Sequence, residues 1–194
     1  MTRIQAIDPA VATGKARTLL DAVKTKMGIV PNLTRVLANA PAALEGYLNF
    51  SGALAGGGLD SKVREQIALT VAQANLCDYC LSAHTLIGGK VGLSKDDIQA
   101  ARAAVSTTPR TDAILKLARA IVVNRGELTD PDLRAARHAG LGDSEIVETI
   151  ANVALNIFTN YLNHAAQTVI DFPKVESGLT HAHSCDTGAC STKS

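Results

Sequence analysis

Aromatic side chains are scarce in this chain of 194 residues: they make up 3% of it, and tryptophan is absent. The formal net charge is only +1, and lysine and arginine do not cluster with aromatic residues, so nucleic acid is not an expected partner. No apolar run approaches the roughly 20 residues that span a membrane. Residues 1–5 contain no apolar signal core, and we therefore expect a cytoplasmic protein with no membrane partner.

The composition favours a folded, helical protein. Hydrophobic residues make up 46% of the chain and charged residues 19%, which is typical of a globular domain. Alanine and leucine are prominent among them, and both favour helices that pack closely. Because no segment shows the alternating pattern of a strand, we expect an all-α helical bundle.

Capping residues, prolines and glycines divide the chain into helical segments. The first helix should run from Asp8 to Gly28, and the longest should begin at Asp143 or Ser144 and run to about Ile170, with Pro173 ending it. The helices between them are expected at 33–37, 41–56, 60–76, 77–89, 94–105, 108–121 and from 129 onward. We expect a single domain over residues 1–175, followed by a polar tail over 176–194.

Residues 91–98 resemble residues 139–146. Each stretch has a Gly-Leu turn and an acidic helix cap before an isoleucine. This similarity indicates a duplicated helical unit, although two turn-and-cap signals of this kind also arise by chance.

Residues 65–84 contain the strongest candidates for chemistry. Cys77 and Cys80 form a C-x-x-C pair, and His84 lies one helical turn after Cys80. Positions i, i+3 and i+7 share one face of a helix, so the three side chains should point the same way. Because structural disulfides are rare in the cytoplasm, reactive or metal-binding cysteines are expected.

The spacing of the two cysteines constrains where the helix begins. Side chains three apart on a regular helix lie about 5–6 Å apart at Cβ, whereas a disulfide needs roughly 3.5–4.5 Å. The pair can therefore close only if Cys77 lies at the helix start. A thiol there is stabilised as thiolate by the helix dipole, and a histidine at i+4 can take its proton.

Two other interpretations of these residues stay open. Cys77, Cys80 and His84 offer three ligands for zinc, where a closed site holds four, as in a metal-binding module. They also fit buried cysteines and a core histidine in a non-catalytic helical interaction protein. A thioredoxin-like site needs flanking strands, and both flanks here are helical.

The pattern Glu65, eleven residues, Cys77-x-x-Cys80, three residues, His84 resembles the alkylhydroperoxidase D-like branch of the carboxymuconolactone decarboxylase family. The helical pattern over residues 5–172 is similar to the longer members of that family. The resemblance implies an alkylhydroperoxidase D-like fold, a homo-oligomer and a thiol-dependent peroxidase acting on alkyl hydroperoxides. A disulfide reductase of the same family is the alternative.

The resemblance also implies residue roles. Cys80 would attack the peroxide, Cys77 would resolve the sulfenic acid as a disulfide, and His84 and Glu65 would relay a proton. An external thiol or dithiol would supply the electrons, with no bound cofactor or metal. Alkylhydroperoxidase D has a histidine where this chain has Tyr79, and a phenol is a poor base near neutral pH. We therefore expect Tyr79 to pack beside the cysteines.

Two weaker signals lie nearer the C-terminus. The longest expected helix carries a polar stripe that consists of Asn152, Asn156, Asn160, Asn163 and Gln167, with His164 beside them. This stripe either faces a subunit contact, lines the reaction pocket or is solvated. The tail contains His181, His183, Cys185 and Cys190, which fit a metal site, a second redox pair or an ordinary polar terminus.

Overall fold

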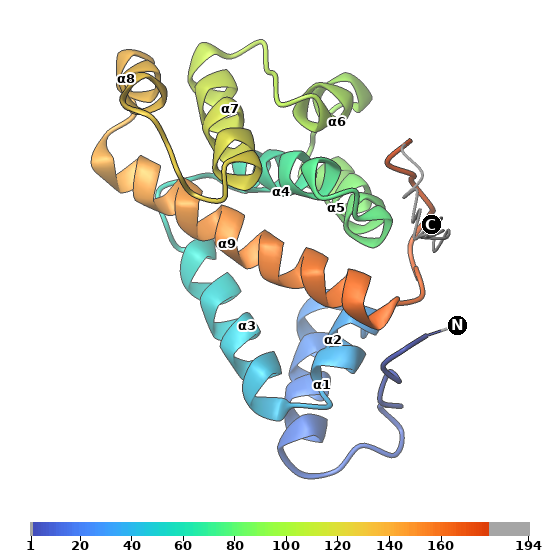
Figure 1. The fold of residues 1–194 in the computed structure, drawn as a ribbon. Coiled ribbons are helices and arrows are strands. Elements are labelled where there is room, and N and C mark those ends of the chain that lie inside the picture. The colour runs from blue at the N-terminus through green and yellow to red at the C-terminus, as the bar shows by residue number, and fades with distance from the viewer. Residues whose placement is uncertain (1, 179–194) are drawn as a thin grey trace, which may run out of the picture.

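A computed structural model describes residues 2–178, and the regular structure in that range is entirely α-helical (Figure 1). The expected all-α fold is confirmed. The helices are α1 (Gly14–Met27), α2 (Asn32–Leu37), α3 (Pro41–Ala55), α4 (Ser61–Ala74), α5 (Asp78–Lys90), α6 (Lys95–Arg102), α7 (Pro109–Val123), α8 (Asp130–His138) and α9 (Asp143–Ala166). Within residues 2–178, no helix combines the length and the apolar character needed to cross a membrane.

Helix α4 lies at the centre of the larger hydrophobic core. It packs against α5, α6, α7 and α9, and its consecutive residues 66–72 are all buried. Five of these seven residues are apolar, as expected of an interior helix, and the hydroxyl of buried Thr70 donates to Ala101 O at 2.7 Å. Its start is fixed by Asp60, whose carboxylate accepts a hydrogen bond from Val63 N at 2.9 Å. The residues before the cysteine pair are therefore rigidly placed.

A second, smaller core joins α1, α2 and α3 around Leu20, Leu37 and Leu44. The long helix α9 runs across both cores, since it contacts α2 and α3 as well as α4, α5 and α7 (Figure 1). Side chains from the two cores meet along α9.

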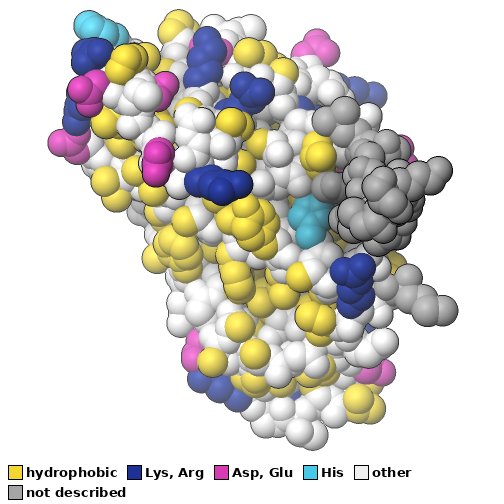
Figure 2. All heavy atoms as spheres, viewed as in Figure 1, with side chains coloured by type: hydrophobic (Ala, Val, Ile, Leu, Met, Phe, Trp, Pro, Cys, Tyr) yellow, Lys and Arg dark blue, Asp and Glu magenta, His cyan; other side chains and the backbone are white. Residues whose placement is uncertain are grey.

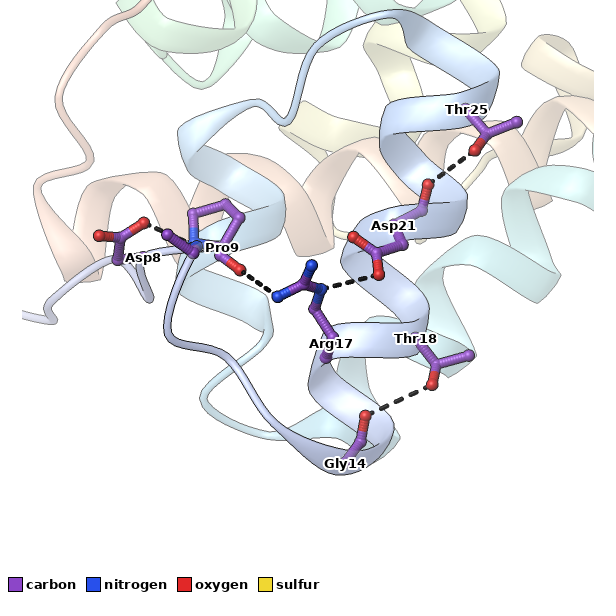
Figure 3. Close-up of polar contacts among 8 residues, drawn as sticks. Asp8, Pro9, Gly14, Arg17, Thr18, Asp21 and Thr25 are labelled. Carbon is purple, nitrogen blue, oxygen red and sulfur yellow. Dashed lines mark hydrogen bonds and ion pairs between the residues drawn. The ribbon is translucent and has the colours of Figure 1, made fainter.

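The first helix begins later than the sequence predicted, at Gly14 instead of Asp8. Asp8 does form a local turn, because its carboxylate accepts from Ala10 N at 2.9 Å and its carbonyl accepts from the amides of residues 11 and 12. The turn does not continue into a helix, and Gly14 has a φ of 55°. Arg17 of α1 donates to Pro9 O at 3.2 Å, which ties the turn to the helix (Figure 3).

The last helix ends at Ala166, so the predicted extension to Ile170 is wrong. Gln167 adopts a left-handed conformation with φ of 48°, and Thr168 N donates back to Asn163 O at 3.2 Å. This is a Schellman-type helix end, which satisfies the terminal carbonyls without any role for Pro173.

The two similar stretches have the same local structure. Gly92 and Gly140 both have positive φ, of 89° and 86°. The following leucines, Leu93 and Leu141, are buried, and each donates its amide to the carbonyl five residues earlier. The shared turn is thus real, whereas its origin by duplication stays a prediction.

After α9 the chain returns across α4, α5 and α6. Val175 N donates to Ser82 Oγ at 2.9 Å, and Arg102 donates to Glu176 O at 2.8 Å. Ser177 N donates to Asp78 Oδ1 at 2.8 Å. Contacts with the helices thus continue to Ser177, one residue past the start of the expected tail. The tail residues His181, His183, Cys185 and Cys190 lie outside the described range.

Candidate active site

The turn between α4 and α5 places the cysteine pair. Leu76 has a φ of 55°, and Cys77 N donates to Ala72 O at 2.9 Å, which closes α4 and redirects the chain. Cys77 is then the N-cap of α5, and its Sγ accepts a hydrogen bond from Cys80 N at 3.4 Å. Cys77 thus lies at the helix start, as the cysteine spacing predicted, and its sulfur faces Cys80.

The two buried thiols have different electrostatic surroundings. Burial raises the pKa of Cys80, but its neighbours outweigh burial and lower this pKa below its ordinary value. These neighbours are the Cys77 thiol, which donates a hydrogen bond, the positive charge of His84, and the side-chain amides of Asn163 and Asn160. For Cys77, the same hydrogen bond to Cys80 and burial both raise the pKa. Cys80 is therefore the thiol of the pair that ionises more readily, and Cys77 is the thiol that donates to it.

Glu65 and His84 form a hydrogen-bonded pair beside these thiols. The Nδ1 atom of His84 and Oε2 of Glu65 are 2.7 Å apart, and both side chains are largely buried. Burial lowers the pKa of His84, but the Glu65 carboxylate outweighs it and raises the pKa above its ordinary value. With Nδ1 held by Glu65, Nε2 is the ring nitrogen left for proton transfer.

A cavity of about 310 Å³ opens beside this pair. Glu65 and His84 line it together with Tyr47 and Tyr79. The remaining wall is mostly apolar and is contributed by residues such as Val23, Leu33, Leu48, Leu54, Ile87, Leu155 and Phe172. The polar pair thus faces a space that suits an apolar organic molecule.

Tyr79 is packed and hydrogen-bonded through its hydroxyl. The hydroxyl oxygen accepts from Leu33 N at 3.0 Å, and the ring makes an edge-to-face contact with Phe172 at 5.6 Å between centroids. Burial raises the pKa of Tyr79, so the phenol stays neutral. These contacts support the packing role expected from the sequence.

The polar stripe of α9 faces inward. Asn152, Asn156, Asn160 and Asn163 are all buried, which excludes a solvated stripe for these four residues. Asn163 Nδ2 donates to Cys80 Sγ at 3.3 Å, and Asn160 Oδ1 accepts from Asn75 at 3.0 Å. Asn152 and Asn156 line the cavity, and Asn160 and Asn163 lie beside Cys80, in agreement with the predicted alternative that the stripe lines a pocket. Gln167, by contrast, is exposed beyond the helix end.

Tyr47 is a site residue that the sequence did not reveal. It projects from α3 into the cavity, and burial, together with the charges of Cys80 and Glu65, raises its pKa to about 12. Tyr47 is therefore a neutral hydroxyl donor at the site. It lies 18 residues before Glu65 in an ordinary helical segment, so no local pattern marks it.

Of the four predicted site residues, Glu65 and His84 line the cavity, whereas Cys77 and Cys80 are buried and do not line it. Both cysteines are free thiols. In the part of the chain from residue 2 to 178, no three His, Cys, Asp or Glu side chains are arranged to hold a metal ion.

The family model for the carboxymuconolactone decarboxylase family matches residues 41–123, the range that contains Glu65, the two cysteines and His84. This range is less than half of the chain, and over it the chain resembles the family. The predicted family resemblance is confirmed. No curated protein sequence matches the chain significantly.

Several solved structures share the fold of this chain. An uncharacterised peroxidase-related protein with an alkylhydroperoxidase D core, from Ralstonia eutropha JMP134, is 26% identical, with a TM-score of 0.76 over 88% of this chain and 92% of that one. A peroxidase-related protein from Silicibacter sp. TM1040 is 21% identical, with a TM-score of 0.74 over 87% and 94%. The debrominase Bmp8, as a cysteine-to-alanine variant in complex with 2,3,4-tribromopyrrole, is 17% identical, with a TM-score of 0.75 over 88% and 92%.

Proposed function

We propose that this protein is a thiol-dependent peroxidase that reduces organic hydroperoxides. The observation that carries the proposal is the asymmetry of the thiol pair, in which Cys80 is surrounded by hydrogen-bond donors and Cys77 is one of them. A low thiol pKa beside a histidine is the usual requirement for a nucleophilic cysteine. The peroxidase-related relative at 26% identity supports the same assignment.

In the first step the Cys80 thiolate attacks one peroxide oxygen and the O–O bond breaks. The departing alkoxide takes a proton from protonated His84 and leaves as an alcohol, while Cys80 becomes a sulfenic acid. Glu65 stabilises the protonated imidazole before the step through its 2.7 Å contact with Nδ1. The hydroxyl of Tyr47, which also lines the cavity, can donate a hydrogen bond to the departing oxygen.

In the second step Cys77 resolves the sulfenic acid. Its thiol gives a proton to the hydroxide that leaves Cys80, water is released, and the Cys77–Cys80 disulfide forms. Cys77 lies at the N-cap, where the backbone is not yet helical, with φ of −92° and ψ of 93°. An external thiol or dithiol then returns two electrons and two protons to the pair.

The cavity indicates the kind of peroxide. Its wall is mostly apolar, and a volume of about 310 Å³ accommodates a compact organic group. We therefore expect a higher kcat/KM for an organic hydroperoxide, such as cumene hydroperoxide, than for hydrogen peroxide.

The proposal is tested by peroxide consumption with a dithiol reductant. Cys80→Ser should abolish turnover, whereas Cys77→Ser should stop after one turnover with Cys80 held as a sulfenic acid or mixed disulfide. Normal turnover by Cys77→Ser would contradict the resolving role. If the wild-type protein reduces model disulfides but no peroxide, it is a disulfide reductase. A parallel assay with a brominated pyrrole tests whether it has the activity of the debrominase neighbours.

A further inference from the structure

Two cationic side chains line the cavity that holds the Glu65–His84 pair. Lys26 lies in the last turn of α1, and Arg64 lies near the start of α4, directly before Glu65. Lys26 is exposed and Arg64 is half-buried, so Lys26 lies where the cavity meets the solvent. The cavity therefore contains positive charge that the proposed peroxide chemistry does not use.

Helical spacing explains why these two side chains face the cavity. Lys26 lies three residues after Val23, which also lines the cavity. Arg64 lies four residues before Ala68, which lines it as well. Side chains three or four residues apart share one face of a helix. The two cations thus belong to the faces that α1 and α4 present to the cavity.

The positive charge of Lys26 and Arg64 is not cancelled inside the cavity. The carboxylate of Glu65 is 2.7 Å from His84 Nδ1, and the protonated imidazole balances its charge. In the described part of the chain, no carboxylate forms an ion pair with Lys26 or Arg64. Arg64 interacts electrostatically with Glu148, but the Glu148 carboxylate is bound by backbone amides and does not line the cavity. An anionic group in the cavity would therefore find two cationic partners.

We propose that the peroxide substrate carries a carboxylate, which binds Lys26 and Arg64 while its hydroperoxide group reaches His84. This inference rests on the proposed peroxidase function and names the substrate class of the same site. A guanidinium binds a carboxylate through two parallel N–H groups, and an ammonium adds a point charge. The apolar side chains of the wall would hold the carbon skeleton.

The size of the cavity limits that skeleton. A volume of about 310 Å³ accommodates a substituted aryl group or a short alkyl chain, whereas a phospholipid hydroperoxide is too large for it. The expected substrate is therefore a compact carboxylic acid that carries a hydroperoxide.

The test compares three hydroperoxides that differ at one position of an aromatic ring. They are cumene hydroperoxide, its para-carboxylate and the methyl ester of that carboxylate, which has a similar shape but no charge. At pH 7 and low salt, the kcat/KM of the wild type should be at least about tenfold higher for the carboxylate than for the ester, as expected of a hydrogen bond to a charged group. This ratio should fall at high salt because salt screens the exposed ammonium.

Variants then assign the preference to the two cations. Lys26→Gln and Arg64→Gln should each lower the carboxylate-to-ester ratio by about three- to tenfold, since each removes one charged partner. The ratio cancels any general loss of activity or of folded protein. Lys24→Gln and Lys62→Gln are the matched controls, because these lysines lie exposed on the same two helices, do not line the cavity and should keep the wild-type ratio. An unchanged ratio in both Lys26→Gln and Arg64→Gln would overturn the proposal.

The outcomes separate this proposal from the peroxidase proposal. If the wild type reduces all three peroxides with a ratio near one, the carboxylate proposal is wrong and the peroxidase proposal stands. If it reduces none of them, the peroxidase proposal fails, and calorimetric titration with the corresponding alcohol of the carboxylate and of its ester decides the carboxylate site. Tighter binding of the carboxylate that Lys26→Gln weakens would support the site, and equal binding of the two alcohols would overturn it.

Discussion

Two thiols three residues apart, whose pKa values are shifted in opposite directions, are the central feature of the site. Their different pKa values arise from neighbours on three helices: His84 on α5, Glu65 on α4 acting through His84, and Asn163 and Asn160 on α9. The C-x-x-C motif alone identifies two reactive thiols, but it does not say which one ionises. The hydrogen bond that Cys77 donates and the amides around Cys80 decide that question.

The Glu65–His84 pair should control the pH dependence of the reaction. In Glu65→Gln the carboxylate that raises the pKa of His84 is lost, so burial dominates and the imidazole is neutral at pH 7. Cys80 then loses a positive neighbour, its pKa rises, and its thiolate is lost at neutral pH. We expect kcat/KM at pH 7 to fall about 10²–10⁴-fold, with partial recovery at higher pH as the thiolate forms.

Thiolate absorbance at 240 nm measured against pH checks the same variant, and its midpoint should lie higher than in the wild type. Glu127→Gln, at an exposed position away from the site, is the matched control and should leave both measurements unchanged. A loss of less than threefold in both Glu65→Gln and His84→Ala would count against the proton relay.

Tyr79 should matter for stability and not for proton transfer. Its hydroxyl accepts from Leu33 N at 3.0 Å, so Tyr79→Phe leaves a largely buried amide without that partner. The free energy of unfolding should fall by about 1–3 kcal/mol, as measured by urea denaturation. The kcat/KM of the folded protein should stay within about twofold of wild type, and a large loss at unchanged stability would assign Tyr79 to the relay.

At the scale of helices, α9 turns a row of polar side chains inward and several large apolar side chains outward. Its asparagines face the core and the site, while Val147, Ile150, Phe158 and Tyr161 are exposed. The usual rule that the polar face of an amphipathic helix points outward gives the wrong answer for this helix. The spacing of the asparagines is visible in the sequence, but their direction depends on the tertiary contact with Cys80.

Much of the helical framework follows from local signals, and the errors are local as well. Ser94 and Asp97 form the capping box that the sequence indicates before α6. The Asp8-Pro9 signal is misleading because it produces only a turn. Helix α9 ends earlier than predicted because Gln167 adopts the left-handed conformation, which is rare for glutamine at helix ends. Tyr47 could not be found at all, because only the packing of α3 brings it to the cavity.

The inward face of α9 gives a test at the same scale. Asn163→Ala removes the amide that donates to Cys80 Sγ at 3.3 Å, so the pKa of Cys80 should rise. We expect the 240 nm titration midpoint to rise by about 1–2 units, since a hydrogen bond to a charged group contributes about 1.5–3 kcal/mol and one unit corresponds to about 1.4 kcal/mol. Gln167→Ala, at the exposed end of the same helix, should leave the titration unchanged.

For the whole molecule, the outward face of α9 is the feature that stands out. Apolar side chains gather across the middle of the face in Figure 2, over α9 and the adjoining α3. The large ones with substantial exposure include Phe50 on α3 and Val147, Ile150, Phe158 and Tyr161 on α9. A contiguous apolar patch on a folded chain usually marks an interface. This patch supports the homo-oligomer expected from the family resemblance, with α9 of a second copy against α9 of the first.

That proposal is testable with a single charge. We expect the wild type to be at least a dimer by light scattering at about 10 µM, because stable interfaces bury roughly 1,000 Å² or more of apolar-rich surface. Phe158→Glu places a carboxylate in the middle of the patch, and by two-fold symmetry opposite itself, so like charges face each other across the contact. The variant should run as a monomer with unchanged helical circular dichroism. Val123→Glu, on α7 and 60% exposed, should keep the wild-type mass. A monomeric wild type at 100 µM would show that α9 is not a contact between copies.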